Sequence, residues 1–459
     1  YVVPPADVAP ATYHDWAHKH WVWLQHSQSN QKNSTDLVQG YLDRGIPVGN
    51  VNVDSEWATE FNNFEIDTEK YPDLPGFVTS MHEQDVRVTM WTTSMVNVEN
   101  PDYDFCVKNN YLVRDAYGVV RPIKWWKGKG GLLDYSNPEA VAWWHGMMDK
   151  VLSLNEAGDG IDGFKTDQTD LYITEYILLS GAALGYENRS LTYREYANYY
   201  YRDFFYYTRE HRGDAGLIMS RPVDCGVDKV TKVCTPASPY DVMYSDWVGD
   251  DDATFNGLTG CLRKVIYSAW DNYANFGCDI GGYRGDSGDE HKDAFVRWAQ
   301  FGAFIPLMEN GGGGEHRPWM YDDETVDIYR KFVLEHYRLI PYWMITGMES
   351  MESGGQKSAL KPIAVKPEDA EDYENPQPST YSYLIGDDLL VHPVVNELSI
   401  VDMTFPAGEN DVWLNWWNPI DMSSAVSGKD SEYTFVQKIP FDSYPVYVKK
   451  NAFVPLQEN

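Results

Sequence analysis

Short apolar runs alternate with longer amphipathic stretches through most of this chain. The runs are bounded by polar or turn-forming residues, so we interpret them as strands of a parallel sheet that is buried on both faces. They occupy residues 21–24, 48–54, 86–91, 160–166, 217–220, 242–245, 276–280 and 301–307. The clearest helical patterns between them occupy residues 138–154, 194–212, 254–273 and 324–339. Eight strands that alternate with helices predict an α/β fold, a (β/α)8 TIM barrel with functional residues at the C-terminal strand ends.

The pattern changes after about Met351. Residues 353–356 and the acidic, proline-containing tract 366–378 are typical of turns and solvated loops. Short alternating runs then predict a β-sandwich, and they occupy residues 381–385, 389–394, 411–417, 434–439 and 446–448. We therefore expect an N-terminal linker (1–18), a catalytic barrel (19–350) and a smaller C-terminal β-sandwich domain (351–459).

Composition narrows the range of partners. The net charge of −32, from 37 basic and 69 acidic residues, argues against nucleic acid or an anionic membrane as a partner, because phosphate binding needs clustered Lys and Arg. No stretch has the ~18 consecutive apolar residues of a membrane span. The chain begins without a basic and apolar signal segment, so we expect any such signal to have been removed or never present. The 17 Trp and 33 Tyr fit a carbohydrate ligand, although most of these rings are expected to be ordinary core residues.

The cysteines and two sequence triplets bear on the compartment. Cys225 and Cys234 bracket a short insert rich in Lys and Pro, which predicts a disulfide-stapled loop. Cys261 and Cys278 form either a second bridge or buried thiols. Triplets with the pattern of N-glycosylation acceptors occur at residues 33–35 and 188–190. These features favour a secreted or luminal protein.

Two acidic clusters carry the candidate chemistry. The run 160–166 ends in Lys165-Thr166-Asp167, which predicts a buried strand that delivers a carboxylate into a cleft. A second cluster, 250–252, follows Trp247. Two carboxylates on opposite sides of one anomeric carbon are the minimum equipment for retaining glycoside hydrolysis. A turn or helix cap is the ordinary role of an Asp after a strand, but we expect Asp162, Asp167 and Asp170 to crowd one strand end, which favours a functional role.

Several short motifs share their order with one known family. They lie at residues 20–23, 45–54, 88–91, 165–167, 220–221, 247–250, 277–283, 317–319 and 445–456. Each is weak alone, but they are colinear from about His20 to the C-terminus. The chain thereby resembles glycoside hydrolase family 31, a family of retaining α-glycosidases. The resemblance covers nearly the whole sequence.

The resemblance implies specific roles. Asp167 would be the nucleophile, and Asp250 in Trp-x-Gly-Asp would be the general acid and base. The implied substrate-binding residues are Asp54, Trp91, Lys165, Arg221 and Trp247. Lys165 lies two residues before Asp167 on a strand, so it would face the same side, bind a sugar hydroxyl and keep Asp167 charged. Asp279 in Asp-Ile-Gly-Gly would organise the structure.

The acidic cluster 250–252 admits other interpretations. Asp251 or Asp252 could be the acid by position alone, but we expect a helix N-cap and a solvated charge for them. A calcium loop is excluded because Phe255 occupies the position where the EF-hand pattern requires Gly. The sequence therefore predicts no metal and no cofactor, and a small-molecule or oligosaccharide substrate. Oligomeric state stays open.

Two departures from the family limit what can be carried over. Members commonly have an Arg-x-His element after the eighth strand, whereas this chain has the glycine-rich stretch 308–316. We expect Glu309 in that stretch to contact the substrate and to favour a sugar such as α-galactose. We also expect the family's N-terminal β-sandwich, with a loop that often completes the pocket, to be missing.

The sequence thus predicts a retaining α-glycosidase that acts on a terminal sugar, and the altered stretch 308–316 indicates an α-galactosidase-like preference. Alternatives within the family are an α-glucosidase, an α-xylosidase and an α-glucan lyase. A catalytically silent carbohydrate-binding protein is the alternative from another class, and the intact carboxylate pair speaks against it.

Overall fold

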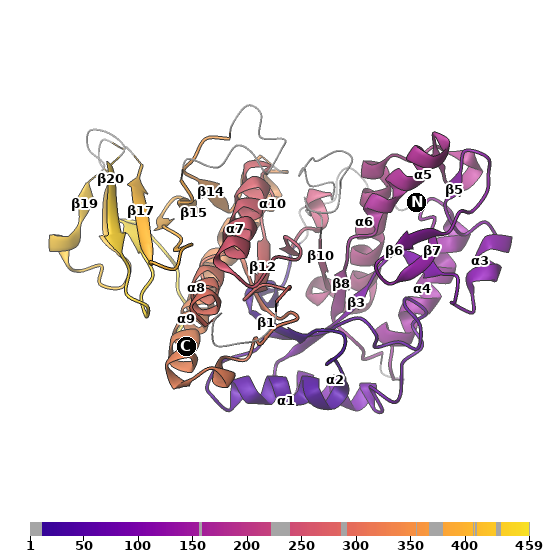
Figure 1. Ribbon diagram of the computed structural model, residues 1–459, viewed down its shortest axis with the longest axis horizontal. Coiled ribbons are helices and arrows are strands. Elements are labelled where there is room, and N and C mark those ends of the chain that lie inside the picture. Colours follow the sequence, from indigo (N-terminus) through magenta and orange to yellow (C-terminus); the bar gives the residue numbers. More distant parts are fainter. Residues whose placement is uncertain are drawn as a thin grey trace.

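Eight parallel strands close into a barrel at the centre of the protein, in a computed structural model (Figure 1). Residues 12–155, 158–221, 239–285, 292–354, 356–366, 380–406, 408, 411–427 and 433–458 are described. In spatial order the strands are β1 (His20–Leu24), β13 (Leu307–Asn310), β12 (Phe276–Ile280), β11 (Ser245–Trp247), β10 (Leu217–Ser220), β8 (Gly163–Thr166), β3 (Arg87–Thr92) and β2 (Asn50–Val53). The predicted TIM barrel is confirmed.

Two predicted strands were placed wrongly. Residues Tyr240–Val242 form a 3-10 turn, so β11 begins at Ser245 instead of 242. The apolar run 301–307 is divided: α8 (Lys292–Gly302) takes its start, and β13 begins at Leu307. Periodicity does not distinguish a buried helix end from a strand. Pro306 also lacks the N–H that the ladder needs, which places the strand start after it.

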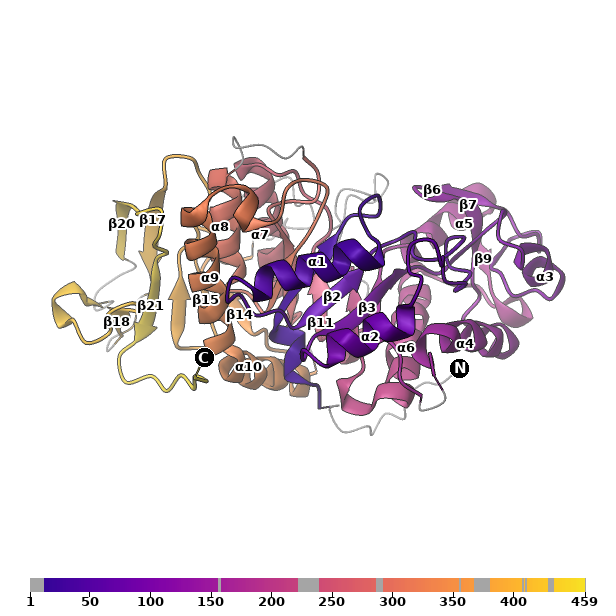
Figure 2. The same ribbon diagram turned by 90° about the horizontal axis from the view of Figure 1, so that it is seen from below.

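Helices surround the barrel (Figures 1 and 2). They are α1 (Gln31–Leu42), α2 (Leu74–His82), α4 (Pro138–Leu152), α6 (Tyr193–Arg212), α7 (Phe255–Trp270), α8, α9 (Asp323–Arg338) and α10 (Ile340–Glu352). The four helices expected from periodicity are confirmed within a few residues. The cap of α7 differs from expectation: Thr254, rather than an Asp of the cluster 250–252, accepts a hydrogen bond from Gly257 N–H at 3.1 Å.

Two insertions, one after β3 and one after β8, build a small subdomain beside the barrel. Its sheet contains β4 (Met95–Asn97), β7 (Gly128–Leu132) and β6 (Ile123–Trp125) in that order. Further elements are α3 (Tyr103–Lys108), α5 (Ile173–Ser180) and the paired β5 (Arg114–Asp115) and β9 (Ala183–Leu184). The hairpin between β6 and β7 carries Trp126 and Lys127 at its tip. Figure 1 shows this part at the end of the molecule opposite the C-terminal domain.

The C-terminal domain is built from antiparallel sheets. One contains β14 (Leu360–Pro362), β15 (Tyr383–Ile385), β16 (Leu389–Val391), β21 (Val446–Lys449), β18 (Val412–Asn415) and β19 (Val426–Ser427). The other pairs β17 (Ile400–Phe405) with β20 (Tyr433–Lys438). Arg297 of α8 joins the domain to the barrel, since it donates hydrogen bonds to Ile439 O at 3.0 Å and Ser443 O at 2.9 Å. The predicted boundary near 350 falls in the last turn of α10.

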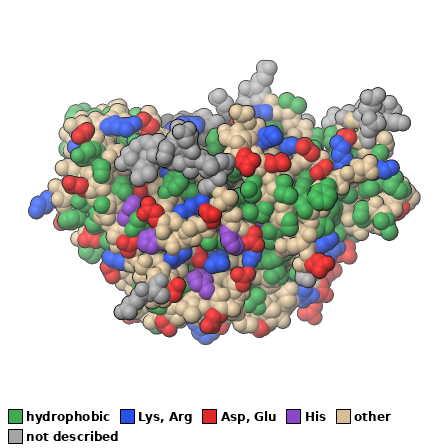
Figure 3. Space-filling model, turned by 180° about the vertical axis from the view of Figure 1, so that it is seen from behind, with side chains coloured by type: hydrophobic (Ala, Val, Ile, Leu, Met, Phe, Trp, Pro, Cys, Tyr) green, Lys and Arg blue, Asp and Glu red, His purple; other side chains and the backbone are tan. Residues whose placement is uncertain are grey.

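Cys261 and Cys278 are free and buried, so the predicted alternative of thiols is correct and the bridge is wrong. The indole N–H of Trp298 donates to the sulfur of Cys278 at 3.2 Å. Cys225 and Cys234 lie outside the described residues. None of the helices in the described ranges has the length and apolarity to cross a bilayer. On the face in Figure 3, Lys and Arg side chains are scattered among Asp and Glu.

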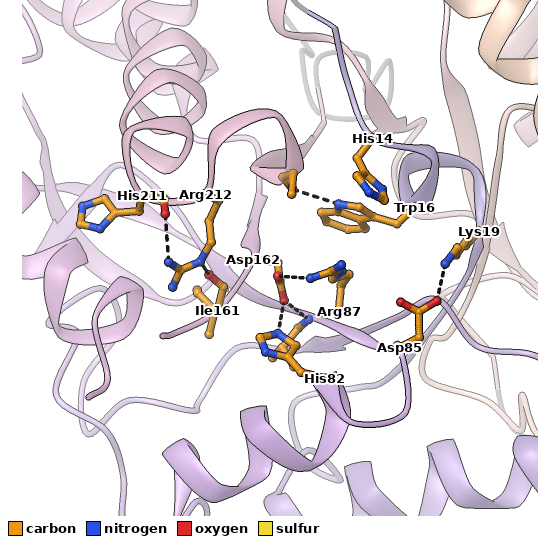
Figure 4. Close-up of polar contacts among 12 residues, drawn as sticks. His14, Trp16, Lys19, His82, Asp85, Arg87, Ile161, Asp162, His211 and Arg212 are labelled. Atoms are coloured by element: carbon orange, nitrogen blue, oxygen red, sulfur yellow. Dashed lines mark hydrogen bonds and ion pairs between the residues drawn. The ribbon is translucent and has the colours of Figure 1, made fainter. Parts of the chain in front are cut away.

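Asp162 lies at the opposite end of β8 from Asp167, so the expected crowding of three carboxylates at one strand end is wrong. Figure 4 shows it between His82 and Arg87. Its carboxylate lies 2.7 Å from His82 Nε2 and 3.3 Å from Arg87 Nη1, and it accepts the Val88 N–H at 2.8 Å. The N-terminal end of a TIM barrel contributes to stability rather than function. Asp162 therefore ties the start of β8 to β3 and α2.

We predict that Asp162→Ala lowers the free energy of unfolding by ~3 kcal/mol, because it leaves the buried Val88 N–H and the partly buried His82 and Arg87 without their acceptor. Asp36→Ala is the matched control, since Asp36 pairs with Lys32 in an exposed i,i+4 contact and its loss should cost under ~0.5 kcal/mol. Urea unfolding followed by circular dichroism measures both. Equal midpoints for the two variants would contradict the assigned role.

Candidate active site

A cavity of about 340 Å³ opens at the C-terminal ends of the barrel strands. Parallel strands end at one rim, so residues far apart in the sequence meet there. Among the described residues, every barrel strand except β13 supplies part of the lining: Trp23, Asp54, Trp91, Lys165, Asp167, Arg221, Trp247, Asp250 and Asp279. The structure thus brings together all of the predicted site residues except Glu309.

Arg221 bridges the two predicted catalytic carboxylates. Its Nη1 lies 3.1 Å from Oδ1 of Asp167 and 3.1 Å from Oδ1 of Asp250. Because both oxygens contact one nitrogen atom, they are at most ~6 Å apart, which is compatible with the ~5–5.5 Å separation of carboxyl groups in retaining glycosidases. The two carboxyl groups therefore face one cavity.

Asp167 is held in one orientation. The indole N–H of Trp91 donates to Oδ2 at 3.0 Å, and the backbone N–H of Gln168 donates to Oδ1 at 2.8 Å. From behind, the hydroxyl of Tyr200 donates to the carbonyl oxygen of Asp167 at 2.9 Å. Trp91 is therefore an orienting donor as well as a cavity wall. The cation in contact with Asp167 is Arg221, whereas the described ion pairs of Lys165 are with Glu309 and Asp279.

Asp250 differs from its acidic neighbours by its position. Its side chain is 23% exposed and lines the cavity, whereas Asp251 lies 2.8 Å from Lys264 Nζ and Asp252 is exposed. Gly249 turns the chain with φ of +84°, and a Cβ there would lie 2.7 Å from Nε of Arg221. Only glycine fits this turn against Arg221, which places Asp250, and neither neighbour, on the cavity.

Lys165 is the second buried cation of the site. Its Nζ lies 2.8 Å from Oε1 of Glu309 and 3.8 Å from Oδ1 of Asp279. It also lies over two indoles, 4.0 Å from the ring centroid of Trp23 and 4.4 Å from that of Trp247. Burial opposes its charge, but the charges of Glu309 and then Asp279 outweigh burial and raise the pKa of Lys165. Lys165 is therefore a fixed ammonium at the cavity floor.

Glu309 lies one layer below the cavity. It is fully buried, and it is absent from the described residues that line the cavity. The expected direct contact of Glu309 with a substrate is therefore not supported by this geometry, in which Glu309 contacts Lys165 instead. Burial raises the pKa of Glu309 and raises that of Asp279 well above its ordinary value. Asp279, expected to be an organiser, lines the cavity itself, and neither of its oxygens has a hydrogen-bond partner among the described residues.

The glycine-rich stretch makes room for an aromatic ring. A Cβ on Gly311 would lie 2.3 Å from Cδ1 of Trp23, so a side chain at 311 has no path to the cavity. Trp23 stacks on Tyr283, with ring centroids 6.0 Å apart. His316 is buried with Nδ1 2.8 Å from Ile280 O, and burial lowers its pKa to about 4. His316 is thus a neutral structural residue outside the cavity lining.

Seven lining residues had no role predicted from the sequence: Trp23, Ser55, Trp126, Lys127, Gln168, Tyr283 and Arg284. Trp23 and Tyr283 lie within motifs that were recognised, at positions without an assigned role. The β6–β7 hairpin brings Trp126 and Lys127 in from the insertion, and local sequence carries no signal for that approach.

Burial raises the pKa of Asp54, a predicted sugar ligand, to about 6. No described group of His, Cys, Asp and Glu side chains is arranged to hold a metal ion.

Asp170 follows Asp167, the predicted nucleophile, and lies outside the cavity lining. It is fully buried, and Tyr201 donates its hydroxyl to Oδ1 at 3.1 Å, while Oδ2 has no partner among the described residues. Burial raises the pKa of Asp170 from 3.8 to about 7. This carboxyl group is therefore protonated over part of the physiological range.

Two models of known protein domains match this chain along most of its length. The model of the glycosyl hydrolases family 31 TIM-barrel domain matches residues 10–345, and that of the glycosyl hydrolase family 31 C-terminal domain matches residues 358–454. An alpha-xylosidase of Emericella nidulans is 23% identical, over 97% of this chain and 54% of that protein. A 1,3-alpha-isomaltosidase of Kribbella flavida is also 23% identical, over 95% of this chain and 61% of that protein.

The fold is shared with solved structures. A family 31 dextranase of Flavobacterium johnsoniae, complexed with glucose, superposes with a TM-score of 0.78 at 20% identity and covers 97% of this chain and 53% of its own. An alpha-xylosidase from a soil metagenome, complexed with xylose, gives 0.74 at 18% identity, over 97% and 65% of the two chains. This chain spans about half the length of the curated relatives it matches.

We predict that Asp170→Asn flattens the dependence of stability on pH. Between pH ~4 and ~7 the folded protein holds a proton on Asp170 that the unfolded chain has released, so the free energy of unfolding falls as pH rises. The variant should match the parent near pH 4 and exceed it at pH 8 by a few kcal/mol, on the order of 1.4 kcal/mol per unit of pKa shift. Denaturant unfolding at both pH values measures this, with exposed Asp36→Asn as control. Parallel curves for parent and Asp170→Asn would refute the shift.

Proposed function

This chain belongs to glycoside hydrolase family 31, and on that premise we propose that it is a retaining α-glycosidase acting on a terminal α-linked sugar. The observation that carries the proposal is the Arg221 bridge, which holds Asp167 and Asp250 against one cavity. The indoles of Trp91 and Trp247 line the same cavity. A pyranose fits there because its C–H faces pack on aromatic rings.

The proposed reaction proceeds in two displacements. Asp167 attacks the anomeric carbon as the glycosidic bond breaks, and Asp250 gives its proton to the departing oxygen. A covalent glycosyl ester on Asp167 results. Asp250 then takes a proton from water, whose oxygen displaces Asp167 and restores the α configuration. Arg221 contacts both carboxylates throughout, and Asp54 and Lys165 bind sugar hydroxyls.

For the sugar itself we propose a preference other than glucose, with α-galactose as the leading candidate. Two features support it: the stretch 308–316 stands in place of the Arg-x-His element that family members commonly have, and the space at Gly311 is filled by Trp23. The histidine with which relatives bind the sugar therefore has no counterpart in the cavity. α-Glucosidase and α-xylosidase activities are the alternatives, since the names of similar proteins include an alpha-xylosidase and alpha-glucosidases.

Two alternative functions use the same site. An α-glucan lyase would form the same covalent ester and then eliminate, giving an anhydro-sugar instead of a hydrolysed sugar. A silent carbohydrate-binding protein would show no turnover. The intact pair Asp167 and Asp250 favours an active enzyme over the silent protein.

We also propose a secreted or luminal location. Asn188 of the triplet 188–190 is exposed and is the last residue of the short turn Tyr186–Asn188, so its side chain is accessible to a glycan. Peptide-N-glycosidase treatment of protein from its native source, followed by mass analysis, tests this. If neither Asn188 nor Asn33 carried a glycan, the result would contradict the proposed secreted or luminal location.

The proposed mechanism predicts how Asp250→Ala depends on the leaving group. An activated phenolate departs without a proton, so this variant should lose ~10²–10⁴-fold more activity on natural linkages than on a dinitrophenyl glycoside. Azide should restore turnover and give an α-glycosyl azide, because the missing carboxylate leaves room on the face where water attacks. Steady-state kinetics on both substrates and NMR of the azide product measure this.

Asp251→Ala is the matched control, because Asp251 faces Lys264 and should show neither effect. Proton NMR of the parent enzyme early in turnover supplies the stereochemical test. Initial accumulation of the β-anomer would contradict the retaining mechanism. Azide rescue of Asp251→Ala would identify Asp251, instead of Asp250, as the general acid.

We further predict that Glu309→Gln changes sugar preference. Loss of the carboxylate removes the nearest partner of Lys165, so the ammonium should shift and alter its hold on one hydroxyl. We expect kcat/KM to fall ~10–100-fold, unequally across aryl α-glycosides of gluco, galacto, xylo and N-acetylgalactosamino type, through ~1–3 kcal/mol of lost charged hydrogen bonding. Glu309→Asp should restore part of the parent ratios. An equal loss of kcat/KM for all the aryl α-glycosides would show that Glu309 does not determine sugar preference.

A further inference from the structure

The candidate active-site cavity has a buried floor and an open mouth. Lys165, Trp91 and Asp54 belong to the floor, since they are only 3%, 4% and 6% exposed. Two residues of the described lining are exposed: Trp126 at 44%, and Arg284, whose side chain is 55% exposed. A sugar that binds against the buried residues therefore has the rest of the substrate at the mouth, beside Trp126 and Arg284.

The position of Asp250 fixes where the leaving group lies. A general acid has to be within hydrogen-bond reach of the departing oxygen, so the leaving group begins next to this carboxyl group. Oδ1 of Asp250 lies 3.1 Å from Nη1 of Arg221, whereas Oδ2 lies 3.9 Å from Nη2 of Arg284. Arg221 is buried and Arg284 is exposed. A group attached to the departing oxygen therefore leaves the cavity past Arg284.

The backbone of Arg284 is tied to the loop that carries the acid. Its N–H donates to the carbonyl oxygen of Asp251 at 2.8 Å, and its carbonyl oxygen accepts the N–H of Ala253 at 2.6 Å. A Cβ on Gly282 would lie 2.7 Å from Cα of Ala253, so the two segments are in close contact. Nη1 of Arg284 lies 3.6 Å from Oδ1 of Asp252. The guanidinium is thus held at a fixed place relative to the acid, and truncating the side chain leaves the backbone contacts intact.

Trp126 supplies an aromatic face at the same mouth. Its ring centroid lies 5.2 Å from that of Trp125 and 6.0 Å from that of Tyr172. Trp125 is anchored in turn, because its indole N–H donates to Oδ1 of Asn97 at 2.7 Å and its ring stacks on Trp91, with centroids 6.5 Å apart. The hairpin tip is therefore joined to the cavity wall through packed rings, which lowers the entropic cost of binding on Trp126.

The chemistry of the mouth selects a class of leaving group. Arg284 offers N–H donors, and Trp126 offers a ring face. Asp250 and Asp252 face Arg284, and Lys127 is the second cation beside Trp126, so two acids and two cations balance and favour neither an anion nor a cation. An apolar group would displace water from the guanidinium without replacing its hydrogen bonds. A neutral sugar matches both groups, since it has hydroxyl acceptors and C–H faces.

We propose that Arg284 and Trp126 form the subsite for the leaving group, and that this leaving group is a neutral sugar unit. The inference rests on the proposed function, because the role of Asp250 as general acid defines where the leaving group lies. The substrate class is then an α-linked disaccharide or oligosaccharide. Its terminal sugar lies on the cavity floor, and its second unit contacts Arg284 and Trp126.

The test compares substrates that share one terminal sugar, the sugar preferred among the aryl α-glycosides. One substrate is the methyl α-glycoside, and the others are disaccharides in which this sugar is α-linked to O3, O4 or O6 of glucose. All these leaving groups are alcohols that need a proton, so the ratio of kcat/KM for the best disaccharide to that for the methyl glycoside reports contacts with the second sugar. We expect Arg284→Ala to lower this ratio about tenfold to a hundredfold, and Trp126→Ala about threefold to tenfold.

Matched controls are available for both variants. Arg189 has a side chain that is 54% exposed beside Glu195, and Tyr117 is 76% exposed in the same subdomain as Trp126. Neither lines the cavity, so Arg189→Ala and Tyr117→Ala should keep the parent ratio. Arg284→Lys should restore part of the ratio, because an ammonium also donates hydrogen bonds. The Tm of each variant checks that it folds.

Two kinetic results would overturn the proposal. Equal losses on the methyl glycoside and the disaccharide, with the basic limb of the pH–rate profile displaced for both, would mean that Arg284 acts only through Asp250. A higher kcat/KM for a disaccharide whose second unit is glucuronic acid instead of glucose would show that the subsite selects an anion.

Binding measurements separate this subsite from the proposed hydrolysis. The variant Asp167→Asn prevents turnover, and calorimetry compares its affinity for the disaccharide with that for the methyl glycoside. Adding Arg284→Ala should weaken disaccharide binding about tenfold or more, and weaken methyl glycoside binding less. Equal weakening, or equal affinity for both ligands before the change, would contradict the subsite. A parent without turnover that keeps the difference in affinity would contradict only the hydrolytic function.

Discussion

The parallel pairing of β1 with β13 is the constraint on which the rest of the structure depends. It joins His20 to Met308 and closes the barrel across nearly the whole catalytic portion of the chain. Closure removes the sheet edges and brings all strand ends to common rims. Without it, Trp23 at the start of the chain would not lie beside Lys165, Tyr283 and Gly311. The cavity is therefore a product of topology before it is a product of any local motif.

Within that rim, charge is distributed by a simple rule. Two buried cations each contact two carboxyl groups: Arg221 contacts Asp167 and Asp250, and Lys165 contacts Glu309 and Asp279. Burial raises the pKa of Asp279 well above its ordinary value. An excess of carboxylates around one centre suits a reaction in which positive charge develops on a sugar.

The two ends of the barrel show a division of labour along single strands. Asp162 and Asp167 flank β8, but the first ties β8 to its neighbours and the second faces the cavity. Helix α6 also has different roles on its two faces. Tyr200 donates a hydrogen bond to the carbonyl oxygen of Asp167, while Tyr199 lines a separate cavity between α4 and α6. Residue type alone does not separate these roles, because an Asp or a Tyr serves either one.

The sequence by itself determined the barrel, most of its strands and helices, and the residues Asp54, Trp91, Asp167, Arg221, Trp247 and Asp250, because hydrophobic periodicity and motif order are local signals. Tertiary structure alone decided which cation pairs with which carboxylate, the placement of Asp162 at the far end of β8, the burial of Glu309, and the approach of Trp126 and Lys127 from the insertion. These depend on distances between segments that lie tens to hundreds of residues apart. No spacing along the chain encodes such distances until the barrel has closed.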